Sequence, residues 1–225
     1  MQINWLRQKQ QSILVKCTHM TTDGYNINII KKGVEYMGGR GSASMKSKSS
    51  SGENMSTGGH LDPMDSKQAN SYLESIGISN TKGTIRAIES YTGEGYQKMR
   101  SGKDPNSIAL IDNYISKSPK FEGTIYRGMS VDSSYISELK SNIGGKISMG
   151  VSSSWTSDKG TARSYTRGEG SRVIFKMNNR RGASITNLSK YGKTEQEVMH
   201  KSNEQYTIVS VRKQGMNTIV TLADE

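Results

Sequence analysis

Three groups of polar residues in the second half of the chain could carry chemistry, and the first is an arginine. Arg127 ends a short β-like run and is followed by Gly128, whose missing side chain lets another group approach the backbone closely. A guanidinium is planar and always charged, so Arg127 in a cleft would suit the two phosphates of a pyrophosphate. Taken alone, the pattern fits an edge-strand arginine in solvent better.

The second group is a run of hydroxyl side chains that includes Ser154, Thr156 and Ser157. Such hydroxyls at the end of a strand can orient a carboxylate or a sugar. In isolation the same residues fit a helix N-cap better, with Ser157 or Asp158 as the cap. Trp155 lies among them, and a large ring beside hydroxyls at a strand end often packs on a flat ligand.

The third group is the carboxylate pair Glu195 and Glu197. On an extended chain these two side chains would point to the same face, about 7 Å apart. In glycosyl chemistry one carboxylate stabilises an oxocarbenium-like transition state while a second handles the proton of the nucleophile. A lone Glu-x-Glu is far more often a charged strand face. It supports a catalytic role only in combination with the other two groups.

Arg127, the hydroxyl run and the Glu-x-Glu pair follow one another on three separate β-like runs. In this combination the sequence resembles the mono-ADP-ribosyltransferases of the arginine–serine–glutamate class, the family of bacterial binary toxins and phage-encoded transferases. The resemblance covers residues 66–225. It includes residues 88–96, which are similar to the tyrosine-containing helix and turn before the arginine strand of that family. It implies an α+β fold, an ADP-ribosyltransferase-like split β-sandwich with an N-terminal helical part.

The resemblance also implies roles for individual residues. NAD would be the substrate whose ADP-ribose is transferred, with Glu197 stabilising the oxocarbenium as nicotinamide leaves. The residues expected to contact NAD are Tyr96, Arg127, Gly128, Trp155 and Glu197. The hydroxyls of Thr156 and Ser157, or of Ser154 after a local shift, would support Glu197, because Trp155 stands where the family usually has the first serine of its motif.

The acceptor is expected to be an arginine on a target protein. Glu195 stands where the family places the residue that selects the acceptor, and a glutamate there implies arginine. A guanidinium is a poor nucleophile until a carboxylate positions it and accepts its proton. The loop of residues 189–193 would recognise the acceptor, with Tyr191 as its exposed aromatic contact.

Periodicity predicts the elements that must position these residues. Apolar residues at helical spacing indicate helices at 66–76, 82–91 and 106–116, with a helical patch at 161–165. Short β-like runs are predicted at 124–127, 146–151, 172–177, 197–200, 206–212 and 218–222. A helical half followed by a strand-rich half is typical of an α+β domain.

Two segments precede this domain. Residues 1–37 are expected to hold a β-hairpin extension that turns at Asp23-Gly24. Residues 38–65 are rich in Gly and Ser and poor in large apolar side chains, which predicts a linker or mobile loop without a packed core.

Composition narrows the classes of protein. The 31 Lys and Arg against 20 Asp and Glu give a net charge of +11, which favours polyanions or a nucleotide pyrophosphate as partners. The chain has no apolar stretch long enough to cross a bilayer, and its polar first residues are not signal-like. One cysteine and three scattered histidines exclude a disulfide framework and predict no metal site.

Three functions stay open at this point. The first is an arginine-directed ADP-ribosyltransferase, expected in the cytoplasm of a bacterial host after delivery by a phage virion or secretion as an effector. The second is an NAD glycohydrolase, in which water replaces the protein acceptor in the same cleft. The third is a basic nucleic-acid-binding or virion-associated module without catalysis, which would show steep salt dependence and indifference to loss of Glu197.

Overall fold

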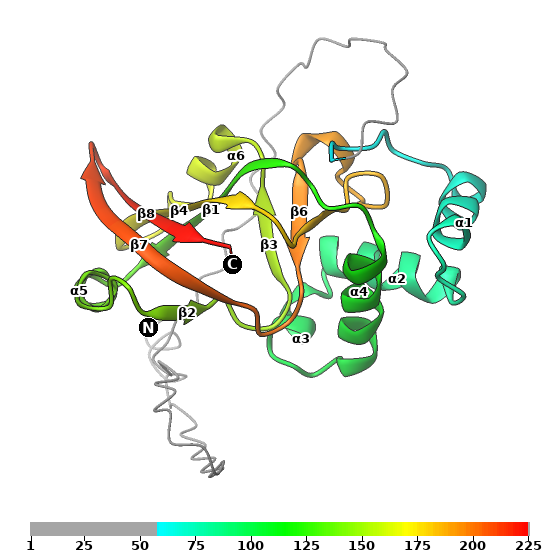
Figure 1. Cartoon of the computed structure of the whole chain (residues 1–225), viewed down its shortest axis with the longest axis horizontal. Helices are drawn as coiled ribbons and strands as arrows, with labels where there is room; N and C mark the ends of the chain where they lie inside the picture. Colours follow the sequence, from blue (N-terminus) through cyan, green and yellow to red (C-terminus); the bar gives the residue numbers. More distant parts are fainter. Residues whose placement is uncertain (1–57, 225) are drawn as a thin grey trace, which may run out of the picture. The chain divides into compact units, whose positions relative to one another are not determined.

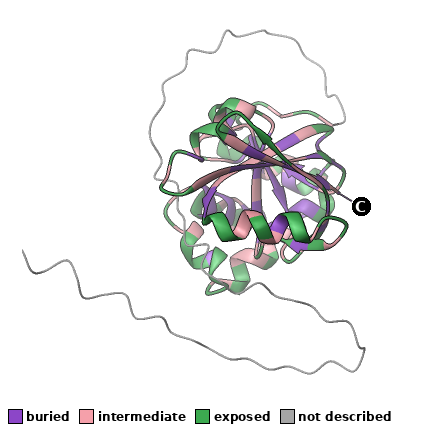
Figure 2. Cartoon of the chain, turned by 90° about the vertical axis from the view of Figure 1, so that its left-hand side faces the viewer, coloured by how far each residue is buried: buried purple, intermediate pink, exposed green. Residues whose placement is uncertain are grey.

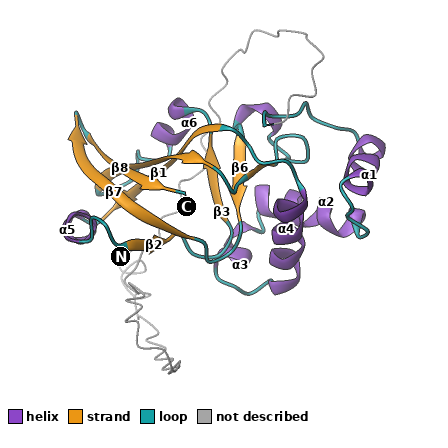
Figure 3. Ribbon diagram, in the orientation of Figure 1, coloured by secondary structure: helices purple, strands orange, loops and turns teal. Residues whose placement is uncertain are grey.

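The computed structural model describes residues 58–224, and these form an α+β unit in which helices precede most of the strands. The strands of this unit make one eight-stranded mixed sheet in the order β2-β7-β8-β4-β1-β3-β6-β5. Figures 1 and 3 show helices α1 to α4 gathered beside β3 and β6, while α5 lies near β7 and α6 lies over β1 and β3.

Each of the three predicted leading helices forms, and in each a polar side chain caps the first turn while an apolar stripe is buried. Asp65 caps α1 and exchanges bonds with Gln68, Asn80 caps α2, and Asp104 caps α4 just before Pro105. The helices are α1 (Ser66–Ser75), α2 (Thr81–Thr92), α3 (Tyr96–Arg100), α4 (Pro105–Lys117), α5 (Ser133–Ser141) and α6 (Lys159–Ser164), with a 3-10 turn at η1 (Gly192–Thr194).

The sheet is antiparallel except where β4 and β8 pair in parallel. Its strands are β1 (Gly123–Val131), β2 (Lys146–Ser148), β3 (Ser153–Thr156), β4 (Ser171–Asn179), β5 (Ala183–Ser184), β6 (Glu197–His200), β7 (Gln205–Gln214) and β8 (Asn217–Ala223). The two edge strands β2 and β5 are short, which limits the exposed backbone that another chain could pair with.

Two hydrophobic cores hold the unit together, and β6 contributes to both. Val198 packs with the strand residues Trp155 and Phe175, whereas its neighbour Met199 packs under the helices with Leu73 and Ile111. Alternate side chains of a strand point to opposite faces, so one short strand reaches both cores. Figure 2 shows the buried residues concentrated along the strands and on the inner faces of the helices. The start of β6, where Glu197 lies, is therefore rigidly placed.

The structure adds elements that periodicity did not predict. Helices α3 and α5, and strands β3 and β5, are too short or too polar to give a clear periodic signal. Strand β3 in particular has the residues Ser-Ser-Trp-Thr, which we expected to follow a strand rather than to form one. Asp158 does cap the next helix, as one of the two predicted caps, by accepting from the backbone of Gly160 and Thr161.

The end of the expected linker also differs from the expectation. Residues 58–65 lie against the domain, with His60 half-buried and Met64 bonded through its backbone to Asn187. Their order comes from contacts with distant residues, which composition does not reveal. The predicted hairpin of residues 1–37 and the rest of the linker lie outside the described residues. Within residues 58–224, no helix combines the length and apolar character needed to cross a membrane.

Candidate active site

The candidate site forms where β1, β3 and β6 lie side by side. Tyr126 on β1 is the register partner of Thr156 on β3, and Thr156 is in turn the partner of Glu197 on β6. These three side chains therefore form one cross-strand row. Glu197 is buried, with 5 % of its surface exposed. A carboxylate of this kind is a candidate for chemistry rather than for surface charge.

The Glu-x-Glu pair does not lie on an extended chain, which corrects the expectation that both carboxylates point to one strand face. Only Glu197 belongs to β6. Glu195 has helical backbone angles just after η1, and Gln196 is in the left-handed region with φ 44°. The turn places the two carboxylates in different surroundings. Glu197 is buried in the sheet, whereas Glu195 is half-buried and accepts a hydrogen bond from the hydroxyl of Tyr165 at 3.0 Å.

The hydroxyls of Thr156 and Ser157 hold this turn. The Thr156 Oγ1 hydroxyl donates to the backbone oxygen of Glu195 at 2.7 Å. Ser157 bonds Gln196 twice, because its Oγ donates to Gln196 Oε1 at 2.7 Å and its backbone N–H donates to the Gln196 carbonyl at 3.1 Å. Both hydroxyls thus act on the two residues immediately before Glu197. Ser154 contributes to a different part of the site, through its backbone.

Arg127 lies one residue beyond the row, at the middle of β1. Its guanidinium donates to the backbone oxygen of Ser154 at 2.6 Å, while its buried Nε has no hydrogen-bond partner among the described residues. Burial first, and then the nearby positive charge of Arg100, lower the pKa of Arg127 to about 10. The group stays charged at neutral pH. A half-buried guanidinium beside a second one makes a strong site for an anion.

Arg100, which sequence reasoning missed, brings that second guanidinium. It ends α3 and lies over the ring of Tyr96, 5.5 Å from the ring centre. Its pKa is raised, most by Tyr91 and further by Glu197 and Tyr96, so these groups all lie close to its charge. One sequence signal was available for Arg100. It lies four residues after Tyr96, which places the two side chains one helical turn apart on the same face of a helix.

Trp155 is not a ligand-stacking ring, which corrects a second expectation. It is 2 % exposed and packs edge-on against Tyr206, with the ring centres 5.7 Å apart. Its indole N–H donates to the Ser153 hydroxyl at 3.1 Å. In β3 the side chains of Ser153 and Trp155 point to the face opposite Thr156, because neighbours on a strand alternate. The ring therefore stabilises the core beneath the site.

Gly128 makes a close packing contact between β1 and α6, and its contact with NAD stays a prediction. A Cβ added at this position would lie 1.7 Å from the backbone oxygen of Ala162, on α6. The close approach that glycine allows is therefore made by the chain's own helix. Gly128 lets α6 rest on β1, beside the arginine.

The remaining predicted residues lie around the same site. Tyr96 is half-buried beneath Arg100, as described. Tyr191, expected to be an exposed aromatic contact, is half-buried at the start of η1, and its backbone oxygen accepts from Thr194 at 3.1 Å. The loop that carries it leads directly into Glu195.

His60 is another residue that no local pattern indicated. Its Nε2 lies 2.8 Å from Ser157 Oγ, although 97 positions separate the two residues in the chain. The ring is half-buried, and burial lowers the pKa of His60 to about 4. Because this contact joins a segment before the first helix to the hydroxyl run, only the tertiary structure could reveal it.

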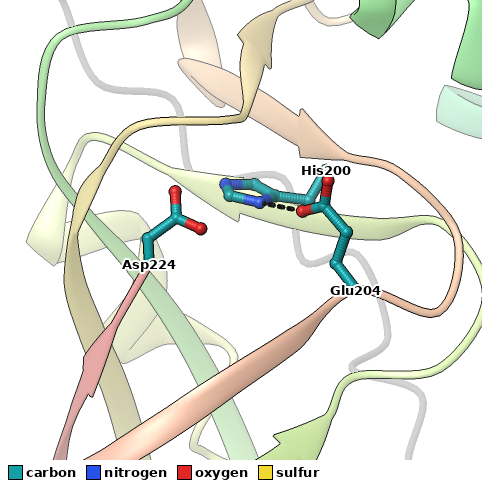
Figure 4. A group of neighbouring side chains, drawn as sticks. All are labelled: His200, Glu204 and Asp224. Atoms are coloured by element: carbon teal, nitrogen blue, oxygen red, sulfur yellow. Dashed lines mark hydrogen bonds and ion pairs between the residues drawn. The ribbon is translucent and has the colours of Figure 1, made fainter.

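A group of side chains with metal-binding potential lies elsewhere, around the start of β7. The ligand atoms of His200, Glu204 and Asp224 lie within 4.8 Å of one another (Figure 4). These atoms are already engaged. His200 faces Glu204 at 2.8 Å and the Asn179 side-chain oxygen at 2.6 Å, and Asp224 pairs with the Arg181 guanidinium. The group acts as a structural network that ties four parts of the chain together.

Comparison with known proteins rests on structure alone, since no protein-family model and no curated protein matches the sequence. The fold matches ADP-ribosyltransferases. HopU1 of Pseudomonas syringae has a TM-score of 0.59 at 18% identity, covering 70% of this chain and 82% of that one. Vis of Vibrio splendidus in complex with agmatine has a TM-score of 0.56 at 18% identity, covering 72% of this chain and 87% of that one.

A third solved structure is exoenzyme S from Pseudomonas aeruginosa in complex with human 14-3-3 protein beta and bound to carba-NAD. Its TM-score is 0.52 at 18% identity, covering 71% of this chain and 82% of that one. The chain therefore has the α+β fold of the bacterial ADP-ribosyltransferases, and the sequence-based resemblance agrees with it.

Proposed function

We propose that this protein is an NAD-dependent mono-ADP-ribosyltransferase that transfers ADP-ribose to an arginine of a target protein and releases nicotinamide. The observation that carries the proposal is that a buried carboxylate, Glu197, lies near enough to the guanidiniums of Arg127 and Arg100 to favour the charged form of both on this fold. Two neighbouring cations, one with a buried Nε that lacks a partner among the described side chains, suit a pyrophosphate.

Glu197 is suited to the bond-breaking step. Departure of nicotinamide leaves positive charge on the ribose C1 and ring oxygen, and a fixed carboxylate stabilises that charge as it develops. The carboxylate of Glu197 is fixed because β6 pairs with β3 and its neighbours Val198 and Met199 are completely buried. Arg127 and Arg100 hold the diphosphate while the ribose reacts, so the diphosphate and the nicotinamide ribose are restrained at once.

Glu195 is suited to the acceptor. The arginine nucleophile must be positioned and must lose a proton as the new C–N bond forms at ribose C1, and a half-buried carboxylate can do both. Tyr165 orients the Glu195 side chain. The solved structure of Vis holds agmatine, whose guanidinium is the functional group of an arginine side chain, and this supports an arginine acceptor for a chain of the same fold.

The test is incubation of the purified protein with labelled NAD and a bacterial lysate, with free nicotinamide measured in parallel. Glu197→Gln should lower both label transfer and nicotinamide release by about a hundredfold or more, since it removes the charge that stabilises the transition state. Glu195→Gln should abolish transfer to protein and retain nicotinamide release.

Arg127→Lys should raise the KM for NAD by about tenfold, because lysine cannot bond two phosphate oxygens in one plane.

Other outcomes would contradict the proposal in different ways. Nicotinamide release without labelled protein in any lysate would favour an NAD glycohydrolase. No release and no label from the wild-type protein would exclude the enzyme, and steeply salt-dependent nucleic-acid binding would then favour the basic binding module. The chemical stability of the label tests the acceptor. A label that hydroxylamine removes and mercuric ion leaves in place would indicate arginine rather than cysteine.

A further inference from the structure

The segment of residues 58–64, here called the strap, lies along the loop that leads to the two glutamates. The backbone N–H of Met64 donates to the Asn187 carbonyl at 3.1 Å, and Asp62 forms an exposed ion pair with Lys193. At its other end the Gly58 carbonyl accepts from the backbone of Glu122 at 2.7 Å. The strap is thus attached at both ends, with His60 between them.

His60 is the one strap side chain that reaches the hydroxyl run in the described structure. Its Nε2 lies 2.8 Å from Ser157 Oγ. Its Nδ1 lies 2.8 Å from Thr186 Oγ1 and 2.7 Å from Ser184 Oγ. The ring packs on Phe121 with the centres 4.6 Å apart. Both ring nitrogens are therefore in polar contacts, and the ring itself is held by an aromatic neighbour.

The hydrogen bonds around His60 run in one direction. Ser157 donates its single hydroxyl proton to Gln196 Oε1, so the bond between His60 and Ser157 requires His60 Nε2 to be the donor. Nδ1 must then accept. Thr186 can supply that proton, because its own oxygen accepts from Ser184 at 3.1 Å. The chain of bonds ends on Gln196, between the two glutamates.

Gln196 needs such support because its backbone is strained. A non-glycine residue with φ 44° lies in the left-handed region, which is unfavourable for a side chain with a Cβ and persists only when neighbours hold it. The Gln196 side chain and carbonyl are both bonded by Ser157. If Ser157 turned away, the peptide that joins Glu195 to Glu197 could relax, and the two carboxylates would change their relative placement.

We propose that His60 is a positioning residue that orients Ser157, and through it the strained Gln196 turn, so that Glu195 and Glu197 are held for reaction. The inference rests on the proposed function for its catalytic meaning, while its structural part concerns the turn alone. It assigns the strap a part in the site that lies outside the arginine, hydroxyl and glutamate groups themselves.

The test compares His60→Ala, His60→Gln and the matched control Asp62→Ala, which removes a strap contact that is exposed and contributes little. His60→Ala should lower kcat for nicotinamide release by about tenfold or more with the KM for NAD nearly unchanged, because misplaced groups slow the reacting step. His60→Gln, which keeps a donor for Ser157, should recover most of kcat. Asp62→Ala should match the wild type.

A double-mutant cycle and hydrogen exchange separate positioning from general folding. In a Ser157→Ala background, His60→Ala should cause little further loss, since the path runs through Ser157. Backbone exchange of residues 194–197 should accelerate in His60→Ala and stay slow in Asp62→Ala, with the rest of the sheet unchanged.

Several results would overturn the proposal. These are an unchanged kcat in His60→Ala, a rise in KM alone, full additivity with Ser157→Ala, or a loss shared equally by Asp62→Ala. Failure of the proposed function looks different, because the wild-type protein itself would then release no nicotinamide. In that case the exchange rates of residues 194–197 still decide whether His60 holds the turn.

Discussion

Three consecutive residues at the site have different physical tasks. Glu195 is half-buried and bonded to Tyr165, Gln196 takes a strained turn held by Ser157, and Glu197 is buried at the start of β6. The strained residue between them is what allows two nearby carboxylates to occupy unlike environments. Groups whose surroundings differ in this way can divide the work of one reaction. At the residue scale, the turn geometry thus matters as much as the identity of the glutamates.

One prediction at this scale concerns pH and His60. Its pKa is lowered by burial to about 4, against 6.5 for an ordinary histidine. Between these two values the unfolded chain binds a proton that the folded chain does not, so the free energy of unfolding falls as pH falls from 6.5 towards 4. The residues that face the ring, Phe121, Ser157, Ser184 and Thr186, are all uncharged.

We therefore expect the wild-type protein to lose more stability than His60→Gln when the pH is lowered from 7.5 to 4.5 in urea unfolding experiments. Glutamine does not titrate, so the difference between the two proteins isolates this one group. Equal losses in the two proteins would mean that His60 is not buried as a neutral ring.

The elements that carry the site are joined by close backbone contacts. The arginine strand β1 pairs with β3 on one side and β4 on the other, and α6 rests on it at Gly128. Helix α6 is itself placed by Asp158, which follows directly on Ser157. A short stretch of chain therefore holds the Gln196 turn and starts the helix that covers the arginine strand. Neighbouring residues therefore serve both predicted purposes, because Ser157 holds the turn and Asp158 caps the helix.

The contact at Gly128 gives a prediction for the element scale. Gly128→Ala should lower the free energy of unfolding by about 3 kcal/mol, because its Cβ would overlap the Ala162 carbonyl and force α6 away from β1. Gly102→Ala is the control, since it has φ +71° with no atom within 4 Å of its Cβ and so reports backbone strain alone. That strain should cost about 1 kcal/mol. A loss in Gly128→Ala no larger than in the control would contradict the packing role.

At the scale of the described unit, two cores are joined through the sheet, and a polar network around Asp224 connects strands on one side of it. Asp224 follows β8 and accepts from the backbone N–H groups of Arg180 and Arg181, at 2.7 and 3.0 Å, while pairing with the Arg181 guanidinium. His200, Glu204 and Asn179 join this network from other strands and turns. The network anchors the last strand beside β4, which is the neighbour of the arginine strand.

The corresponding prediction compares an ion pair that has a buried carboxylate with an exposed pair. Asp224→Ala should destabilise the protein by about 2 kcal/mol or more, because it leaves two backbone N–H groups without their acceptor and removes the nearest carboxylate from the Arg181 guanidinium. Asp62→Ala breaks the exposed pair with Lys193 and should cost about 0.5 kcal/mol or less. Thermal or urea unfolding measures both. Similar small losses in the two variants would show that the Asp224 network contributes little.

Much of the architecture was determined locally and was therefore predictable from sequence. Helices α1, α2 and α4 carry their own caps and apolar stripes, and β4, β7 and β8 carry alternating or apolar runs. The order of Arg127, the hydroxyl run and Glu197 along the chain indicated the fold that the structure has. Local signals suffice for such features because they depend on spacing within a few residues.

Only the tertiary structure decided how the site residues face one another. It placed Trp155 in the core, used Gly128 for packing, turned the chain at Gln196, and brought Arg100 and His60 beside residues far away in sequence. The physical reason is that burial, backbone strain and hydrogen bonds across 27 to 126 positions arise from packing, which no short pattern encodes. The residue types indicated the kind of chemistry, whereas only the fold determined the surroundings of each residue and so the role that each is suited to.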